Sequence, residues 1–402
     1  MAGPALDRQL NPPATAGGAA GVRFARATER DDAAIRRLLR ENPTPGEISL
    51  SFEREPDYFR GNGLAGAIDD TVLAFDRAGG QVICMGRCST RERFVNGEPR
   101  RVGYLGELRL DRSAQGRFDV VRRGYRFLRE LHAGRQPDLY FTSIAADNRR
   151  SIAFLERGVP GLPAYRFAAG FVTVVLPSPR AGAAQRLRRR AEERLRGCGC
   201  RFLPGAEAET EAGLAGWLHL LNVHGSQYQL AGGWTADQWH SLARLGLSSA
   251  DLLVINRGGR LAGGAGLWDQ RSFRQVVLRR YSGRMALARP WLNCLARLSG
   301  RPRLPAAGST LAHAFLSPMA VDPGQPPVLV ALVEMGLARA AERGLDYLTL
   351  GFDARDPRLG EVRRQFGGRE YASRLYRVCW PEESGRADEF DGRLFLPESA
   401  LL

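Results

Sequence analysis

Apolar positions along the chain alternate between a period of two and a period of three to four, which predicts strands and helices in turn. Residues 22–42, VRFARATERDDAAIRRLLREN, predict a strand, a turn and an amphipathic helix whose apolar stripe is Ile35, Leu38 and Leu39. Further along, 103–112 and 139–144 predict strands on either side of a helix at 120–132. This order indicates an α/β protein.

The same order of elements occurs a second time. Segments 72–90 and 252–269 each predict two strands joined by a glycine turn, because glycine supplies the positive φ of tight hairpins. The remaining matches in the second half are a strand at 311–321, a helix at 328–344 and a strand at 347–352. Each half closes with a β-rich stretch, at 164–176 and 370–380. The chain is therefore expected to hold two copies of one fold.

The length of 402 residues agrees with two domains of about 100–200 residues each. We expect a region of 283–310, rich in Pro and Gly and helical in part, to be an insertion into the second copy. The expected boundaries are a disordered tail at 1–20, a first domain at 21–177, a linker helix at 178–198, a second domain at 199–381 and a polar tail at 382–402.

The formal net charge of +15 comes entirely from arginine, since the chain has no lysine. With many Ala, Gly and Pro, this composition indicates GC-rich, bacterial-like coding. The positive charge favours an anionic ligand such as a nucleotide cofactor. The arginines are mixed with Asp and Glu in both halves and are not interleaved with aromatic residues, which argues against a nucleic-acid-binding protein.

Apolar runs and cysteines indicate the compartment. No run approaches the roughly 20 apolar residues needed to span a bilayer, and the first residues lack the apolar core of a signal peptide. The six cysteines are expected to be free thiols, and Cys198 and Cys200 stand too close for ordinary zinc ligands. We expect a cytoplasmic protein without a metal site.

Two segments of the first half carry candidate chemistry. In LDRSAQGRFDV (110–120) a strand runs into a helix, and Gln115, Gly116 and Arg117 stand at the turn. Unpaired N–H groups at a helix start bind anions, and glycine lets the backbone approach them. In DNRRSIAFLERG (147–158), Asn148 is placed to cap a helix, and Ser151 is a small residue in its first turn.

These two segments resemble the phosphate loop and the Asn-containing segment of the GNAT superfamily of N-acyltransferases. The resemblance is detailed over 22–176 and covers 200–380 in outline. It implies two tandem GNAT-like domains, each a mixed, mostly antiparallel sheet flanked by helices. Tandem GNAT domains also occur in Fem-type aminoacyl transferases and in the mycothiol-synthase type. The chain departs from the family pattern where loop glycines are replaced by Phe118 and Val120, and where the usual tyrosine is Leu155. Phe118 and Asp119 are expected to crowd a pyrophosphate.

The resemblance implies acyl transfer from acetyl-CoA or another acyl-CoA to an amine. Glu107 then stands where family members place a carboxylate base, and Tyr165 is the candidate proton donor for the departing thiolate. The implied cofactor-binding residues are Leu108, Arg109 and Leu110 through their main chain, the turn residues Gln115, Gly116 and Arg117, and the helix residues Asn148 and Ser151.

The second copy is expected to be degenerate. Its corresponding loop, 322–327, contains three prolines, which cannot donate the N–H groups that an anion needs. We expect this copy to shape the acceptor pocket, with His224, Tyr228, Trp268 and Tyr281 as candidate lining residues. Two other functions stay open at this point: a catalytically silent GNAT-fold binding protein, and a Fem-type transferase that uses aminoacyl-tRNA.

Overall fold

The computed structural model describes residues 21–44, 46–76, 80–203, 210–299, 302–380 and 390–402. The strands are β1 (Val22–Arg26), β2 (Ile48–Glu53), β3 (Ile68–Asp76), β4 (Val82–Val95), β5 (Glu98–Leu110), β6 (Leu139–Ala145), β7 (Ala164–Pro177), β8 (Cys200–Phe202), β9 (Leu252–Arg257), β10 (Arg260–Trp268), β11 (Gln275–Tyr281), β12 (His313–Val321), β13 (Tyr347–Asp353) and β14 (Arg369–Cys379). The helices are α1 (Asp32–Glu41), α2 (Phe118–Leu131), α3 (Arg149–Glu156), α4 (Ala181–Gly197), α6 (Glu211–Gly225), α7 (Ala236–Ala243), α8 (Gly283–Ser299), α9 (Pro326–Glu342) and α10 (Pro357–Phe366).

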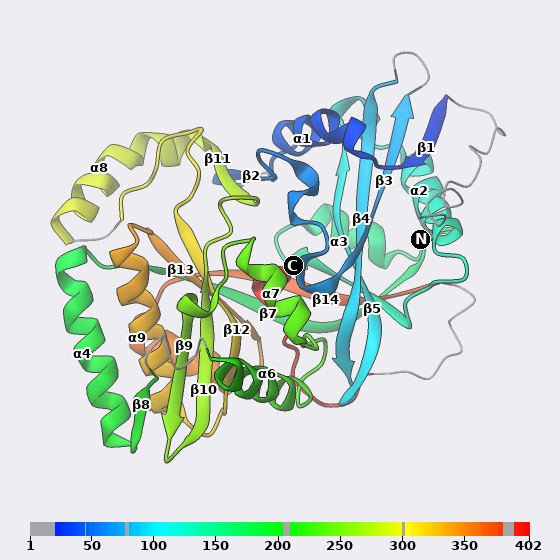
Figure 1. Cartoon of the computed structure of the whole chain (residues 1–402). Helices are drawn as coiled ribbons and strands as arrows, with labels where there is room; N and C mark the ends of the chain where they lie inside the picture. Colours follow the sequence, from blue (N-terminus) through cyan, green and yellow to red (C-terminus); the bar gives the residue numbers. More distant parts are fainter. Residues whose placement is uncertain (1–20, 45, 77–79, 204–209, 300–301, 381–389) are drawn as a thin grey trace, which may run out of the picture.

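The predicted strand and helix order is confirmed in both halves, and the two copies share one 12-stranded sheet (Figure 1). Its order is β1-β3-β4-β5-β6-β14-β7-β13-β12-β10-β9-β8. The hairpins predicted at 72–90 and 252–269 are β3–β4 and β9–β10. Most neighbours are antiparallel, and the described parallel pairs are β5–β6 and β12–β13. The predicted tail at 1–20 lies outside the described residues.

The two halves exchange their last strands. β14, from the second half, lies between β6 and β7 and pairs antiparallel with both. In return β7, from the first half, lies between β14 and β13. Each half therefore completes its sheet with a strand from the other, and neither set of strands is contiguous in sequence.

Further contacts also join the halves. β2 pairs with β11 in a separate two-stranded sheet. The main chain of Phe94 on β4 exchanges hydrogen bonds with Leu230 and Ala231. Residues 390–402, expected to be part of a polar tail, instead form a packed segment between the halves, which we call the C-terminal strap. Its Phe395 and Leu396 are buried because they contact cores that both halves supply.

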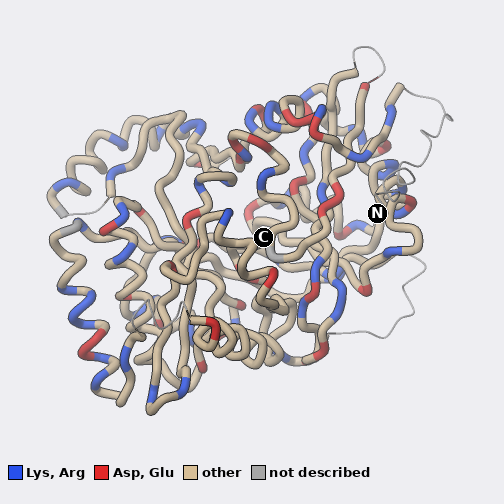
Figure 2. The backbone as a smooth tube through the Cα atoms, viewed as in Figure 1, with Lys and Arg blue, Asp and Glu red and all other residues tan. Residues whose placement is uncertain are grey.

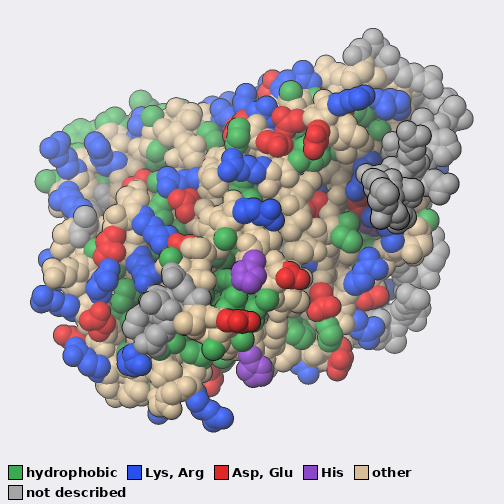
Figure 3. Space-filling model, in the orientation of Figure 1, with side chains coloured by type: hydrophobic (Ala, Val, Ile, Leu, Met, Phe, Trp, Pro, Cys, Tyr) green, Lys and Arg blue, Asp and Glu red, His purple; other side chains and the backbone are tan. Residues whose placement is uncertain are grey.

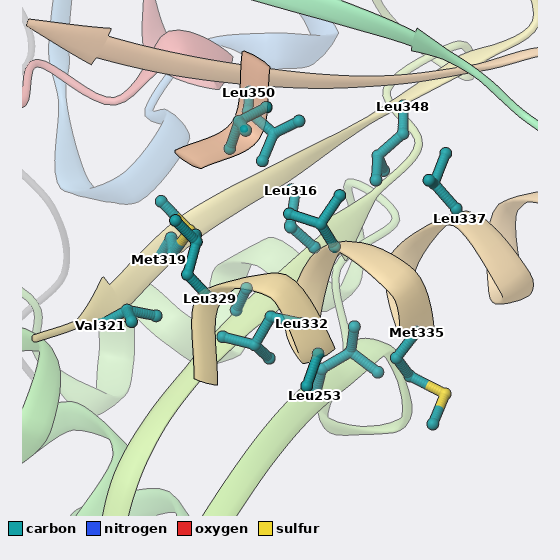
Figure 4. Packing of buried hydrophobic residues seen from close by; sticks show 14 of the residues in the cluster. Leu253, Leu316, Met319, Val321, Leu329, Leu332, Met335, Leu337, Leu348 and Leu350 are labelled. Carbon is teal, nitrogen blue, oxygen red and sulfur yellow. The ribbon is translucent and has the colours of Figure 1, made fainter. Parts of the chain in front are cut away.

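The second-half core is built around α9, which is apolar on nearly every side. Figure 4 shows Leu329, Leu332, Met335 and Leu337 of α9 among side chains from β9, β12 and β13. The predicted linker helix, α4, packs along α9 through its buried alanines and Leu195. A helix that is apolar all round must be covered on every side, which is why α4 lies against it.

Both copies have the same irregularity in the strand before their main helix. In β5, Glu107 and Leu108 lie opposite the single residue Gly86 of β4. In β12, residues 317–318 lie opposite Gly266 of β10 in the same way. These β-bulges bend each strand away from its parallel neighbour. β5 accordingly pairs with β6 only over Val102–Tyr104, and β12 with β13 only over His313–Phe315.

Among the described residues, no helix combines the length and the apolar composition that crossing a bilayer requires.

Candidate active site

A cavity of about 870 Å³ fills the gap where β5 and β6 diverge. Its walls include 105–110 of β5 and 142–145 of β6. Thr142 donates a hydrogen bond to the Leu105 carbonyl at 2.7 Å, where the regular pairing ends. The cavity extends from the start of α2, through the sheet at the bulge, to the face that α1 covers. It therefore connects the two segments that the sequence singled out.

The predicted phosphate loop forms the mouth of this cavity. Gly116 has φ +85°, a conformation that favours glycine, and Gln115, Gly116 and Arg117 all line the opening. Phe118 does not close it, contrary to the expected crowding. Its side chain is 54% exposed and stacks on Phe154 of α3, with ring centroids 4.5 Å apart. The two rings form one rim of the mouth.

The Asn-containing segment lines the opposite side of the mouth. Asn148 Oδ1 accepts a hydrogen bond from Ser151 N at 3.2 Å, so Asn148 caps α3 as expected. Both residues line the cavity, together with Arg150 and Arg157. The cap fixes where α3 begins, and thereby places two arginines beside the opening.

Glu107 stands on the bulge with φ +54°, which is uncommon for a residue other than glycine. Arg54 Nε donates to Glu107 Oε1 at 2.8 Å, and the Tyr58 hydroxyl donates to Oε2 at 3.0 Å. Arg87 Nη1 lies 3.6 Å from Oε1. The carboxylate thus accepts hydrogen bonds on both oxygens, and the bulge turns it toward the α1 face.

The surroundings of Glu107 determine its charge. Burial acts to raise its pKa, but the nearby positive charges, first Arg54 and then Arg87 and Arg274, outweigh burial and hold the pKa well below the usual value. Glu107 is therefore an anion at neutral pH, and an ion-paired carboxylate is a weak proton acceptor. The next residues, Leu108, Arg109 and Leu110, line the cavity beside it, and their main-chain contacts to a cofactor stay a prediction.

Tyr165, the candidate proton donor, lines the cavity from the start of β7. Its hydroxyl shares a hydrogen bond with the hydroxyl of Tyr125 on α2. Burial raises the pKa of Tyr125 to about 12 and raises that of Tyr165 well above its usual value. Both phenols therefore keep their protons at neutral pH, and each is a weaker acid than a free tyrosine.

An apolar arm of the cavity lies between α2 and the sheet. It is walled by Phe24 of β1, Val72 and Ala74 of β3, Cys84 of β4, and Val121, Gly124, Tyr125 and Leu128 of α2. At Gly124 an added Cβ would meet Phe24 at 3.6 Å, so the missing side chain leaves room in this arm. The arm suits an alkyl chain rather than a polar group.

On the opposite face, which α1 covers, the cavity is lined by arginines. They are Arg54, Arg87, Arg91 and Arg93 from the first half and Arg274 from the second. Burial lowers the pKa of Arg93 to about 9 and that of Arg274 to about 10. Arg274 donates its described hydrogen bonds to the main-chain oxygens of Ala400 and Leu402 in the strap. Arg87 also pairs with buried Asp69 at 2.6 Å, and Arg91 and Arg93 lie near the buried Glu398. Among the described residues, Arg274 forms no ion pair with these carboxylates.

The four candidate lining residues of the second half lie elsewhere. His224 and Tyr228 contact each other and buried Arg358, and burial together with Arg358 lowers the pKa of His224 to about 3. Trp268 is fully buried and donates to the Leu245 carbonyl, while Tyr281 donates to that of Pro305. None of the four lines the cavity. Their bulk fills cores and anchors loops.

Sequence reasoning missed Arg54, Tyr58 and Arg274, which surround Glu107 from distant segments. Arg54 follows β2 and Arg274 precedes β11, the two strands that pair across the halves. No short-range pattern marks either residue, because their meeting depends on that pairing. The Phe118–Phe154 rim was visible only as two apolar residues in helical segments.

No protein-family model matches the chain, and no curated protein sequence matches it. Among solved structures, it is similar to Saccharomyces cerevisiae N-myristoyltransferase with bound myristoyl-CoA (TM-score 0.55, 10% identity, 94% of this chain and 87% of that chain). A second structure of that enzyme with myristoyl-CoA gives TM-score 0.56 and 9% identity over 92% and 81% of the two chains. A GCN5-related N-acetyltransferase from Sphaerobacter thermophilus gives TM-score 0.50 and 13% identity over 89% and 95%.

The chain has the GNAT fold. The similarity covers most of the chain in each comparison, and it confirms the fold predicted from the two sequence segments. Within this GNAT fold, the open gap between diverging strands belongs to the first copy. Among the described residues, no group of His, Cys, Asp or Glu has the size and placement of a metal site.

Replacing Glu107 by Gln is expected to lower the free energy of unfolding by about 3 kcal/mol at pH 7, because Arg54 stays buried without its anion. The pKa of Glu107 is lower in the folded protein than its unfolded value of about 4.3, so the ionised carboxylate stabilises the fold above that pH. This stabilisation is lost as the pH falls toward the folded pKa. The difference from wild type should thus hold from pH 8 to 5 and shrink below about pH 4.

Urea denaturation across this pH range measures the effect, with Asp119→Asn as the control. That change removes one partner of the exposed Arg117–Asp119 pair and should cost less than about 1 kcal/mol. An equal, pH-independent loss in both variants would contradict the assignment of Glu107 as a partly buried, paired anion.

Proposed function

We propose that the protein is an N-acyltransferase that moves an acyl group from the thioester of acyl-CoA to an amine. The observation that supports this most directly is the continuous cavity from the turn before α2, along the gap between β5 and β6, to the bulge at Glu107. Its mouth, slot and bulge follow one another in the same order as the nucleotide, the pantetheine arm and the thioester of acyl-CoA.

The residues at the mouth fit the nucleotide end of coenzyme A. The start of α2 turns the positive end of its helix dipole toward a pyrophosphate, although the N–H groups of Phe118 and Val120 are hydrogen-bonded within the turn. Arg117, Arg150 and Arg157 add positive charge beside the opening. The Phe118–Phe154 stack presents an aromatic face on which an adenine ring can pack.

The slot fits the pantetheine arm. An extended amide chain between the diverging strands can take up main-chain hydrogen bonds that β5 no longer makes with β6. At the bulge, main-chain groups of 107–109 leave the regular ladder, so an N–H there is able to polarise the thioester carbonyl.

The chemistry needs a neutral amine, a polarised carbonyl and a proton for the leaving sulfur. The amine nitrogen attacks the carbonyl carbon, a C–N bond forms, and the C–S bond breaks. Tyr165, paired with Tyr125, donates its proton to the thiolate. Since Glu107 is held as an anion, we assign it to orienting the amine, whose proton leaves through water in the cavity.

The apolar arm under α2 supports an acyl group longer than acetyl. It begins near Leu105 beside the slot and is walled by aliphatic and aromatic side chains. The similar N-myristoyltransferase structures hold myristoyl-CoA, which agrees with a long chain in this fold.

Arg274, which forms no ion pair within the described part of the chain, supports an acceptor amine that also carries an anionic group. Arg54, Arg87 and Arg274 surround the reaction point on this face, and Glu107 is the carboxylate between them. A carboxylate on the acceptor balances this charge and holds the amine beside the thioester.

Acyl-CoA is expected to raise the melting temperature of the wild type, with about 2.7 kcal/mol of stabilisation at one hundred times Kd. Gly116→Trp should abolish this shift, because the side chain projects into the mouth. Gly134→Trp is a matched control: both glycines have positive φ and open space around Cβ, but Gly134 lies outside the cavity.

Differential scanning fluorimetry with acetyl-, octanoyl- and myristoyl-CoA makes this measurement. If no acyl-CoA stabilises the wild type, the protein is a silent GNAT-fold scaffold instead. Salt-sensitive binding of RNA in place of acyl-CoA would favour a donor of the aminoacyl-tRNA kind.

Gly124→Leu is expected to fill the apolar arm. Affinity for myristoyl-CoA should fall at least tenfold, since each buried CH₂ contributes about 0.8 kcal/mol, while affinity for acetyl-CoA stays within about twofold. Gly124→Ala, which the 3.6 Å contact tolerates, is the control. Calorimetric titration gives both affinities. If affinity for the two acyl-CoAs fell equally, the acyl chain would not lie in the apolar arm.

Amino acids and short peptides with free carboxylates are expected to stabilise the acyl-CoA-loaded protein more than their C-terminal amides do. Triglycine and triglycinamide make a matched pair, because they differ in the carboxylate and keep the same amine. Arg274→Met should remove the preference without removing the acyl-CoA shift. If no carboxylated amine binds, or the amides bind equally well, the anionic-acceptor assignment is rejected.

A further inference from the structure

Helix α8 has its apolar side turned away from the protein. Leu287, Trp291, Leu295 and Leu298 are 80%, 77%, 61% and 79% exposed. Their spacing of about one helical turn places them in a single outward stripe. Globular proteins normally bury such a stripe, so this surface is a candidate interaction site.

The inward side of α8 is held by polar contacts. Asn293 donates to the Leu304 carbonyl at 3.2 Å and accepts from Leu304 N at 2.7 Å. Arg289 also donates to the Leu304 carbonyl, at 3.3 Å, and lies over the ring of Tyr281. These bonds to the returning segment fix the rotation of the helix, and they keep the apolar stripe outward.

The stripe is bordered by positive charge. Arg284 and Arg297 are exposed at the two ends of α8, and the helix contains no acidic residue. Figure 2 shows further blue segments along neighbouring α4, and Figure 3 shows arginine and hydrophobic side chains together on this edge of the molecule. An apolar stripe edged by arginine alone matches a surface that is apolar inside and anionic outside.

A cationic pocket lies at the end of the stripe. It has a volume of about 500 Å³ and is lined by Arg180, Arg297, Arg303, Pro302 and Asp346. Arg180, just before α4, donates to the carbonyl of Arg297, which ties the pocket to α8. In the described part of the chain, none of the three guanidinium groups forms an ion pair. The pocket holds three guanidinium groups against the one carboxyl of Asp346, and guanidinium groups bind phosphate well.

We propose that α8 and this pocket bind the surface of an anionic lipid bilayer. The stripe of Leu287, Trp291 and Leu298 enters the boundary between headgroups and acyl chains, and the three arginines bind lipid phosphates. The helix, about 25 Å long, lies in the plane of the membrane. A second copy of the chain suits this surface less well, because two α8 helices would bring their arginines together without any acidic partner.

The binding partner is tested with vesicles of phosphatidylcholine alone and with about 30% phosphatidylserine added. Flotation should recover the full chain with the anionic vesicles and leave it free with the neutral ones. Binding should weaken strongly at about 0.5 M salt, because screening removes the electrostatic part. Equal binding to neutral vesicles, or none to either, would overturn the proposal.

The insertion of the stripe has its own readout. The other tryptophans, Trp217, Trp234, Trp239, Trp268 and Trp380, are buried, so quenching by brominated lipids should report Trp291. Trp291→Phe should lose the quenching and keep vesicle binding. Quenching that persists in this variant would show that another face meets the lipid.

Two sets of variants separate the apolar and charged contributions. Leu287→Asp with Leu298→Asp should lower vesicle affinity at least about tenfold and leave the melting temperature unchanged, because both side chains are exposed. Arg180→Glu with Arg303→Glu should remove the preference for anionic vesicles. Arg257→Glu, an exposed arginine at the β9–β10 turn, is the charge control and should retain most binding. Light scattering could instead show a dimer that dissociates in the variant with Leu287→Asp and Leu298→Asp. If the wild type also failed to bind vesicles, the stripe would be assigned to contact with a second copy.

Discussion

The pairing of β14 with both β6 and β7 is the constraint on which the rest of the structure depends. It joins the halves into one sheet and supplies β6 with a full antiparallel partner on one side. With that side satisfied, β6 keeps its direction while β5 bends away at its bulge. The cavity therefore exists because a strand from the second half holds β6 in place. The two halves are expected to unfold together for the same reason.

The two copies differ in what fills the gap beside the bulge. In the first copy the gap is the cavity that reaches Glu107. In the second copy Ser317, on the equivalent bulge, donates to Glu398 of the C-terminal strap at 2.7 Å. Burial raises the pKa of Glu398 to about 7, although Ser317 and nearby arginines oppose the rise. The same fold thus has an open slot in the first copy and a filled gap in the second. The strap also places the main-chain oxygens of Ala400 and Leu402 within hydrogen-bonding distance of Arg274.

Hydrophobic periodicity was enough to predict the element order, both hairpins and the α1 stripe of Ile35, Leu38 and Leu39, all of which are buried. The local motifs also located the mouth, since Gly116 and Asn148 act within a few residues of their own positions. Strand exchange, the meeting of Arg54 with Glu107, and the place of the strap could not be predicted. Each depends on segments far apart in sequence, and a single sequence gives no measure of their distance. His224 and Trp268 were misplaced because pockets and cores use the same aromatic residues.

The outward position of the apolar stripe on α8 is set by its polar contacts with the rest of the protein. The strands and the helices α1 and α9 bury their apolar side chains because the shared sheet offers them a core on both sides. The region holding α8 is the predicted insertion, and its helix contacts the body through Asn293 and Arg289 rather than through leucines. Turning α8 by half a turn would bury the leucines but would break those hydrogen bonds and bury an arginine, at several kcal/mol for the unpaired charge alone. The polar anchors therefore set the orientation, and the exposed leucines and Trp291 are its consequence.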